Sequence, residues 1–229
     1  MRKLWLVAAG LLAAGICLGA DDPAEKSGLI FKLTFKDKNL TADVAGGEKS
    51  PVKQNNVTFA EGKGGVAAVF KDGAILTYKS AGNFNPAAGT LMMWIKPGET
   101  CETIFAMGPW YKNNFLALRV SAKFKNIHAA FKHNSAPVGE VNDSRVPETN
   151  VWHHYALTWG EGGMKLYLDG KLLMTSPLVE TWVAGETPDE MWIGSGPDGI
   201  YSANSALSDI RIYDHALSAE EISSAIEKP

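Results

Sequence analysis

Two short segments of this sequence carry residue types that bind sugars. Trp110 and Tyr111 are followed closely by Asn113 and Asn114 in a turn-like segment, and Trp182 lies in a second segment of loop character. Aromatic rings offer flat apolar faces to the C–H side of a sugar ring, and Asn side chains can bond its hydroxyls. We therefore expect these five residues to form a carbohydrate-binding site. The alternative is that the tryptophans are buried and plug an end of the fold.

Paired carboxylates, which glycoside hydrolases place on either side of the scissile bond, are not evident. Two acids on one face of a strand would be two or four residues apart. Glu140 and Asp143 are three apart in a segment expected to be a loop, and Asp189 and Glu190 are adjacent. We therefore expect a binding domain rather than an enzyme. A hydrolase or lyase with catalytic residues dispersed over separate strands is the alternative.

The histidines and the cysteine of the expected domain favour structural roles. His153 and His154 are neighbours in a strand-like run, so their side chains point to opposite faces and cannot easily share one metal ion. His128 and His133 have no cysteine or acid at zinc-ligand spacing. Cys101 precedes a strand-like run and is expected to be a packed thiol rather than a nucleophile.

Strand signals run along almost the whole chain. Short runs of β-branched, aromatic and leucine residues are each bounded by turn residues, at a spacing typical of an all-β sandwich. No alternation of strands with helices occurs, which excludes a parallel α/β sheet. The expected strands cover residues 29–35, 57–59, 66–70, 74–78, 90–96, 103–107, 115–121, 126–133, 152–159, 164–168, 171–175, 191–194 and 207–213.

Local signals predict one tight hairpin and one short C-terminal helix. Asp169 and Gly170 separate two strand-like runs, and an Asp-Gly pair supplies the positive φ angles of a two-residue hairpin turn. Ser218 and Glu221 have the spacing of a capping box, in which each side chain bonds the backbone N–H of the other residue. Ile222 lies on the apolar face of the helix that follows.

The order of these segments resembles the laminin G-like (LamG) domains of the concanavalin A-like lectin/glucanase superfamily. The resemblance spans residues from about 28 to 226 and implies a jelly roll of two antiparallel sheets packed face to face. Ala203 and Ser205 replace an aromatic residue and a glycine that are common before the last strand of the family. The motifs are LIFKLTF at 29–35, TLMMWIKP at 90–97, WHHYALT at 152–158, LYLDG at 166–170, IG at 193–194 and LSDIRIYDHALSAEEI at 207–222.

The same resemblance bears on catalysis and on calcium. The glucanase branch carries a Glu-x-Asp-x-(x)-Glu strand, which does not occur here. Many relatives hold one structural Ca²⁺, a hard cation that prefers carboxylate and carbonyl oxygens, and the matching positions here are Asp37, Asp43 and Asp209. The alternative is that Asp37 and Asp43 shape turns by bonding the backbone, while Asp209 pairs with Arg211.

The length of the chain indicates a single domain, and its charge argues against a nucleic-acid-binding protein. The chain has 229 residues, of which 45% are hydrophobic, so it can bury the core of one domain. Its formal net charge is −3, and no basic stripe is present that would neutralise a phosphate backbone. Nucleic acid is therefore not an expected partner.

The first 20 residues have the pattern of a secretory signal peptide. Arg2 and Lys3 precede an apolar stretch at 4–18 and two small residues, Gly19 and Ala20. The apolar stretch is shorter than a membrane span requires. A bulky residue before Cys17 disfavours lipid anchoring. We expect residues 21–229 to be a single exported domain, periplasmic or extracellular, without an internal disulfide or a transmembrane segment.

These patterns together predict an exported, non-catalytic LamG-like domain that binds carbohydrate or a glycosylated surface, with calcium as a possible structural cofactor. The alternative function is an envelope or extracellular protein–protein interaction module. A polysaccharide hydrolase or lyase is the third hypothesis.

Overall fold

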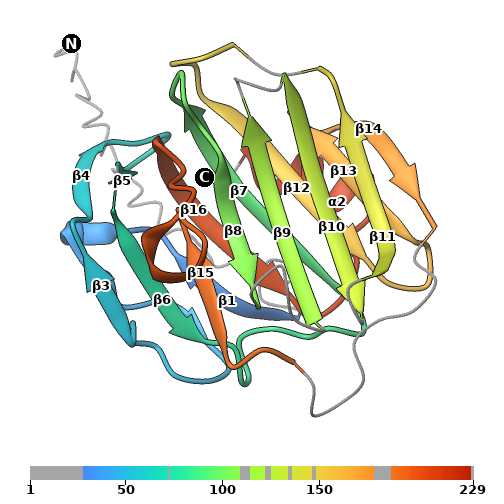
Figure 1. Ribbon diagram of the computed structural model, residues 1–229, viewed down its shortest axis with the longest axis horizontal. Coiled ribbons are helices and arrows are strands. Elements are labelled where there is room, and N and C mark those ends of the chain that lie inside the picture. The colour runs from blue at the N-terminus through green and yellow to red at the C-terminus, as the bar shows by residue number, and fades with distance from the viewer. Residues whose placement is uncertain are drawn as a thin grey trace, which may run out of the picture.

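Two antiparallel sheets stacked face to face make up the protein, as the sequence predicts. The computed structural model describes residues 28–71, 73–108, 114–121, 125–133, 136–145, 148–177 and 187–227. The signal-peptide prediction concerns residues 1–20, which lie outside this range. Figure 1 shows the two layers, with strands β8 to β11 of one sheet in front of strands β7 and β12 to β14 of the other. We name the rear layer sheet A and the front layer sheet B.

Sheet A has nine strands among the described residues, and they pair antiparallel. Seven follow the spatial order β14-β13-β12-β7-β16-β1-β2, while β5 pairs with β16 and β4 pairs with β5. Their bounds are β1 Leu29–Leu33, β2 Val44–Ala45, β4 Thr58–Glu61, β5 Val66–Phe70, β7 Gly89–Pro97, β12 His153–Trp159, β13 Met164–Leu168, β14 Lys171–Ser176 and β16 Ser205–Tyr213.

Sheet B has seven strands in the described part of the chain, in the spatial order β11-β10-β9-β8-β15-β6-β3. Two short 3-10 helices, η1 (Lys36–Lys38) and η2 (Pro197–Gly199), lie in connections, and η2 falls between β15 of sheet B and β16 of sheet A. The strand bounds are β3 Lys53–Asn55, β6 Ile75–Lys79, β8 Thr103–Met107, β9 Asn114–Ser121, β10 Asn126–His133, β11 Ala136–Asp143 and β15 Glu190–Ile193.

One large apolar core fills the space between the sheets. Sheet A contributes Leu91 and Trp159, and sheet B contributes Phe105, Leu118 and Phe131, each at most 1% exposed. Successive side chains of a strand point to opposite faces, so every second residue of these strands enters the core. The remaining side chains form the two outer faces of the sandwich, where a binding site can be built.

The outer face of sheet A is partly covered by α2 (Ala219–Glu227). Ile222 of the helix is fully buried in a small cluster that includes Met92 and Tyr167 of the sheet. The predicted capping box is confirmed, because the Ser218 N–H donates to the Glu221 carboxylate (2.7 Å) and the Glu221 N–H donates to the Ser218 hydroxyl (3.2 Å). In the described part of the chain no helix is long and apolar enough to cross a membrane.

The predicted hairpin between β13 and β14 is also confirmed. Asp169 and Gly170 both have positive φ angles, 49° and 75°, as a two-residue turn of this type requires. The Asp169 carboxylate accepts hydrogen bonds from the His154 N–H and pairs with the His153 ring, both at 2.8 Å. The turn therefore also fixes the start of β12.

Three strands were missed by the sequence patterns. Strand β2 has two residues, β3 consists of exposed polar side chains, and β11 contains proline and glycine in place of an apolar run. The expectation that Glu140 and Asp143 lie in a loop is therefore wrong, because both belong to β11. An edge strand tolerates such a composition because only one of its sides needs backbone partners.

Candidate functional site

A groove crosses the outer face of sheet B and has a cavity volume of about 230 Å³. Strands β8, β9 and β10 form its base, and the segment around η2, which curls in front of the sheet in Figure 1, forms one side. This volume is smaller than that of pockets that enclose a drug-sized ligand, so the groove is a shallow surface feature. We call it the sheet B groove, and its lining residues are Thr103, Ala106, Phe115, Ala117, Arg119, His128, Lys132, Gly196, Pro197 and Tyr201.

A row of three alanines crosses the outer face of sheet B, and two of them, Ala106 and Ala117, line the groove. Ala117 of β9 is paired in register with Ala106 of β8 on one side and with Ala130 of β10 on the other. Trp192 of β15 continues the row next to Ala106. Each alanine projects only one methyl group and is at most 2% exposed, so the larger side chains beside the row supply the accessible surface of the groove.

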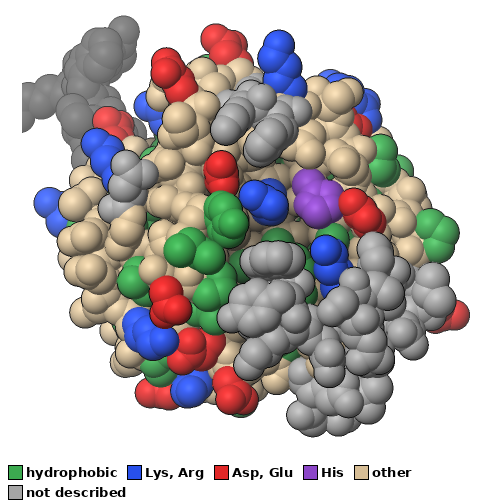
Figure 2. Space-filling model, viewed as in Figure 1, with side chains coloured by type: hydrophobic (Ala, Val, Ile, Leu, Met, Phe, Trp, Pro, Cys, Tyr) green, Lys and Arg blue, Asp and Glu red, His purple; other side chains and the backbone are tan. Residues whose placement is uncertain are grey.

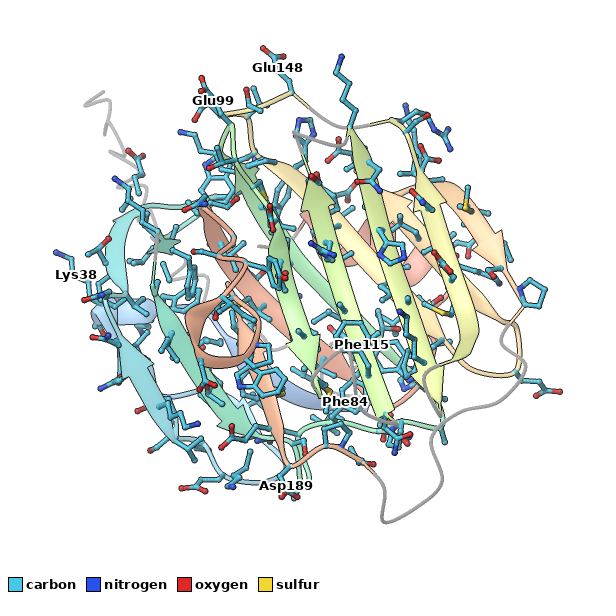
Figure 3. The ribbon with its side chains drawn as sticks, in the orientation of Figure 1. Lys38, Phe84, Glu99, Phe115, Glu148 and Asp189 are labelled. Carbon is cyan, nitrogen blue, oxygen red and sulfur yellow. The ribbon has the colours of Figure 1, made fainter. Side chains whose placement is uncertain are left out.

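Aromatic rings border this base. Phe115, labelled in Figure 3 near the start of β9, packs against the cluster of Ala106, Ala117 and Trp192. Tyr201 is 51% exposed although it is a large aromatic residue. Exposed aromatic faces beside small residues provide the apolar surface on which a sugar ring packs.

A row of polar side chains crosses β9 and β10 at one end of the groove. Arg119 and His128 are paired in register, and Figure 2 shows a histidine on this face between basic and acidic side chains. The Arg119 guanidinium lies 5.5 Å from the centre of the Tyr201 ring and 3.5 Å from the Glu102 carboxylate. The His128 Nε2 atom lies 2.9 Å from a carboxylate oxygen of Glu140.

Burial lowers the pKa of His128, with smaller contributions from the positive charges of Arg119 and Lys132, whereas the Glu140 carboxylate opposes the shift. The imidazole is therefore neutral at pH 7. Because a carboxylate only accepts hydrogen bonds, the proton is assigned to Nε2, which leaves Nδ1 as an acceptor. The histidine can thus take a hydrogen bond from a ligand hydroxyl.

The carbohydrate site predicted from the sequence is mostly outside the described residues. Trp110, Tyr111, Asn113 and Trp182 belong to that part of the chain, so their role stays a prediction. Asn114 is described, but it is only 8% exposed and lies on the opposite face of β9 from Phe115. The structure does not place its side chain in the sheet B groove.

The three candidate calcium ligands are engaged separately. Asp43 accepts hydrogen bonds from the N–H and the hydroxyl of Thr34, both at 2.8 Å, and Asp209 pairs with Arg211 inside the protein. Asp37 is exposed on η1. No group of three His, Cys, Asp or Glu side chains suited to a metal ion occurs in the described ranges. These residues do not form a ready calcium site, and calcium binding stays an untested prediction.

The residues that build the groove were not identified from the sequence. Phe115, Ala117 and Arg119 alternate with core residues of β9, so each is hidden in a run that reads as an ordinary strand. Tyr201 comes from a connection some 80 residues further along the chain. A usable signal was present, namely alanine at the central outward positions of β8 and β9 with an aromatic and a basic residue nearby.

The sequence and the fold define a lectin-like β-sandwich. Residues 70–223 match the laminin G-like family described as "Concanavalin A-like lectin/glucanases superfamily". This match covers more than half of the chain, and the protein belongs to that superfamily. No curated protein sequence matches the chain.

Solved structures show the same fold at low sequence identity. One is domain 4 of AbnA, an extracellular arabinanase from Geobacillus stearothermophilus, solved in complex with arabinotriose. It is 18% identical with a TM-score of 0.66, and the match covers 86% of this chain and 98% of that one. The receptor-binding domain of botulinum neurotoxin C/D mosaic serotype is 18% identical with a TM-score of 0.67. The match covers 87% of this chain and 51% of that one. A structure of botulinum neurotoxin type C, whose cell entry depends on interaction with two ganglioside molecules, is 16% identical with a TM-score of 0.67. That match covers 87% of this chain and 51% of the other.

Proposed function

We propose that this protein is a carbohydrate- or glycoconjugate-binding domain whose binding site is the sheet B groove. The observation that carries the proposal is the groove base at Ala106 and Ala117, bordered by Phe115 and Tyr201, with hydrogen-bonding side chains at one end. A sugar ring needs both an apolar surface for its C–H face and polar groups for its hydroxyls. The fold relatives that bind arabinotriose and gangliosides support the same function.

The groove is long enough for more than one sugar unit. Phe115 and Arg119 are four residues apart on β9, which corresponds to about 13 Å along a strand. The apolar contact at Phe115 and the polar contacts at Arg119 and His128 are therefore made by different parts of the ligand. An oligosaccharide satisfies both ends at once, whereas a single ring does not.

The proposal includes export of the domain. It is supported by the leader-like sequence of residues 1–20 and by the extracellular location stated for the arabinanase relative. Mass spectrometry of the protein recovered from the medium and from the cell fractions of its producing cell tests whether those residues are removed.

Binding to a panel of neutral and acidic oligosaccharides, measured by isothermal titration with the wild type and two variants, tests the site. Phe115→Ala removes the aromatic border, and Ala117→Leu fills the base without removing any polar group. We expect each change to lower the affinity for the bound sugar about tenfold or more, because Phe115→Ala removes apolar contact with the ligand and Ala117→Leu obstructs the base of the groove.

Leu172→Ala is the matched control, because Leu172 is a 51% exposed apolar residue on β14 of the other sheet. It should leave the affinity unchanged, and thermal melts should show that all three variants are folded. Unchanged binding by both groove variants would place the sugar site elsewhere. No binding to any oligosaccharide would favour a protein-docking module instead.

A further inference from the structure

The charged side chains that line the sheet B groove are all basic types. Arg119 and Lys132 are cations, His128 is the third ionisable nitrogen group, and the described lining contains no aspartate or glutamate. This is unusual for a chain with a formal net charge of −3. The groove therefore offers mainly hydrogen-bond donors and positive charge to whatever enters it.

Two nearby carboxylates contact the nitrogen groups of His128 and Arg119 from outside the lining. Glu140 binds the His128 ring at 2.9 Å. Glu102 lies 3.5 Å from an Arg119 nitrogen, which is longer than the 2.7–2.9 Å of a strong charged hydrogen bond. The Arg119 side chain is 37% exposed and its guanidinium faces the Tyr201 ring. Glu102 and Tyr201 thus position the Arg119 guanidinium, and its N–H groups can still donate hydrogen bonds to a ligand.

We propose that the sheet B groove binds acidic saccharides, with a ligand carboxylate paired to the Arg119 guanidinium. The inference rests on the proposed function and specifies its ligand class. A guanidinium matches a carboxylate with two parallel hydrogen bonds, and such bidentate pairs are stronger and more specific than bonds to neutral hydroxyls. A sugar that carries a carboxylate, such as a uronic or sialic acid, has this group at the edge of its ring.

Lys132 gives the groove a second cation at its other end. It is paired in register with Phe115, and its ammonium nitrogen lies 5.8 Å from the centre of that ring. The distance between the Phe115 and Arg119 positions is about 13 Å along the strand. Two cations at this separation suit a chain with more than one acidic unit, so the affinity should rise with the number of uronate residues.

The test compares acidic oligosaccharides with their neutral methyl esters. Oligogalacturonate, hyaluronan oligosaccharides and 3′-sialyllactose serve as probes, and esterification removes the charge while keeping the sugar skeleton. We expect at least one acid form to bind about tenfold or more tightly than its ester, with an affinity that falls as salt is added. Arg119→Gln should lower the affinity for that acid by a larger factor than the affinity for its ester, so that the two affinities converge.

Lys132→Gln should weaken binding of the longer acidic probes, whereas Lys171→Gln, at an exposed position of β14 in sheet A, is the charge-matched control. Equal affinity for every acid and its ester, or an Arg119→Gln effect of the same size on both, overturns the inference and leaves the proposed function intact. Absence of binding to all acidic and neutral saccharides overturns both.

Discussion

Arg211 places a positive charge at one of the most buried positions of sheet A. Its side chain is 1% exposed, and its Nε and Nη2 atoms donate to the two carboxylate oxygens of Asp209 at 2.9 and 2.6 Å. Asp209 has a positive φ of 48° at an irregularity in the pairing of β16 with β7. The irregular backbone lets Leu207 and Ile210, which are three residues apart, both enter the core, and it leaves Asp209 beside Arg211.

Asp209→Asn should lower the free energy of unfolding by about 3 kcal/mol, because it leaves the buried Arg211 charge without its counter-ion. Asparagine keeps the shape of the side chain and tolerates the left-handed backbone, so the change isolates the charge. Urea denaturation of both proteins measures the difference.

Asp198→Asn is the matched control, since Asp198 also has a positive φ, 55°, but is exposed. It should change the free energy of unfolding by less than about 0.5 kcal/mol. Equal effects at the two positions would mean that the Asp209 carboxylate contributes no more than a surface charge.

At the scale of elements, α2 depends on its first turn. The reciprocal bonds of Ser218 and Glu221 satisfy two backbone N–H groups that have no partner within the helix. Ser218→Ala should therefore destabilise the protein by about 1 kcal/mol. Chemical denaturation checks this value.

Ser224→Ala, at an exposed position within the same helix, provides the comparison. We expect an effect smaller than about 0.5 kcal/mol there, since alanine is at least as good a helix former as serine. If Ser224→Ala cost as much as Ser218→Ala, the cap would have no special role.

The sequence was sufficient for those elements that carry a periodic apolar pattern or specific turn chemistry. Strands β5, β8, β10 and β13 begin and end at the predicted residues, and so does the Asp169-Gly170 turn. Polar strands such as β3 were missed because backbone pairing alone holds them at an edge. The pattern of side chains within one strand cannot report an edge position, which depends on the neighbours in the sheet.

The groove was harder to predict than the strands that form it. Sequence reasoning favoured aromatic residues in turns, where a tryptophan or tyrosine is conspicuous. The groove instead uses outward residues of three adjacent strands, such as Ala106, Ala117 and His128, which come together only once register is fixed. Register depends on long-range pairing, and a shift of one residue would exchange the core and groove faces.

At the scale of the whole molecule, the core is shared by both sheets, so neither sheet can open without exposing it. Cys101 lies in this core with no exposed surface, and the Ser205 hydroxyl donates to its sulfur at 2.9 Å. Burial raises the pKa of the Cys101 thiol to about 12. Burial therefore keeps the thiol protonated and inaccessible in the folded protein, and it outweighs the Ser205 hydrogen bond, which lowers the pKa.

We expect Cys101 to react with a thiol reagent only after global unfolding. In a Cys17→Ser background, where Cys101 is the sole cysteine, labelling at pH 8 should be at least about a thousandfold slower than in denaturant. Adding Leu172→Cys to this background supplies an exposed thiol that should label at once. Rapid labelling of Cys101 itself would show that the sandwich opens locally at this position.

The two ends of the described chain lie on the side of sheet A. The Gly28 carbonyl accepts a hydrogen bond from the Asp214 N–H, directly after β16, and α2 continues from there across the outer face of the same sheet. The groove occupies the opposite side of the sandwich. A tether joined to either of these ends would therefore attach to the domain on the side of sheet A, away from the groove. The domain can rest with its groove flat on a broad polysaccharide surface while its attachment points away from that surface.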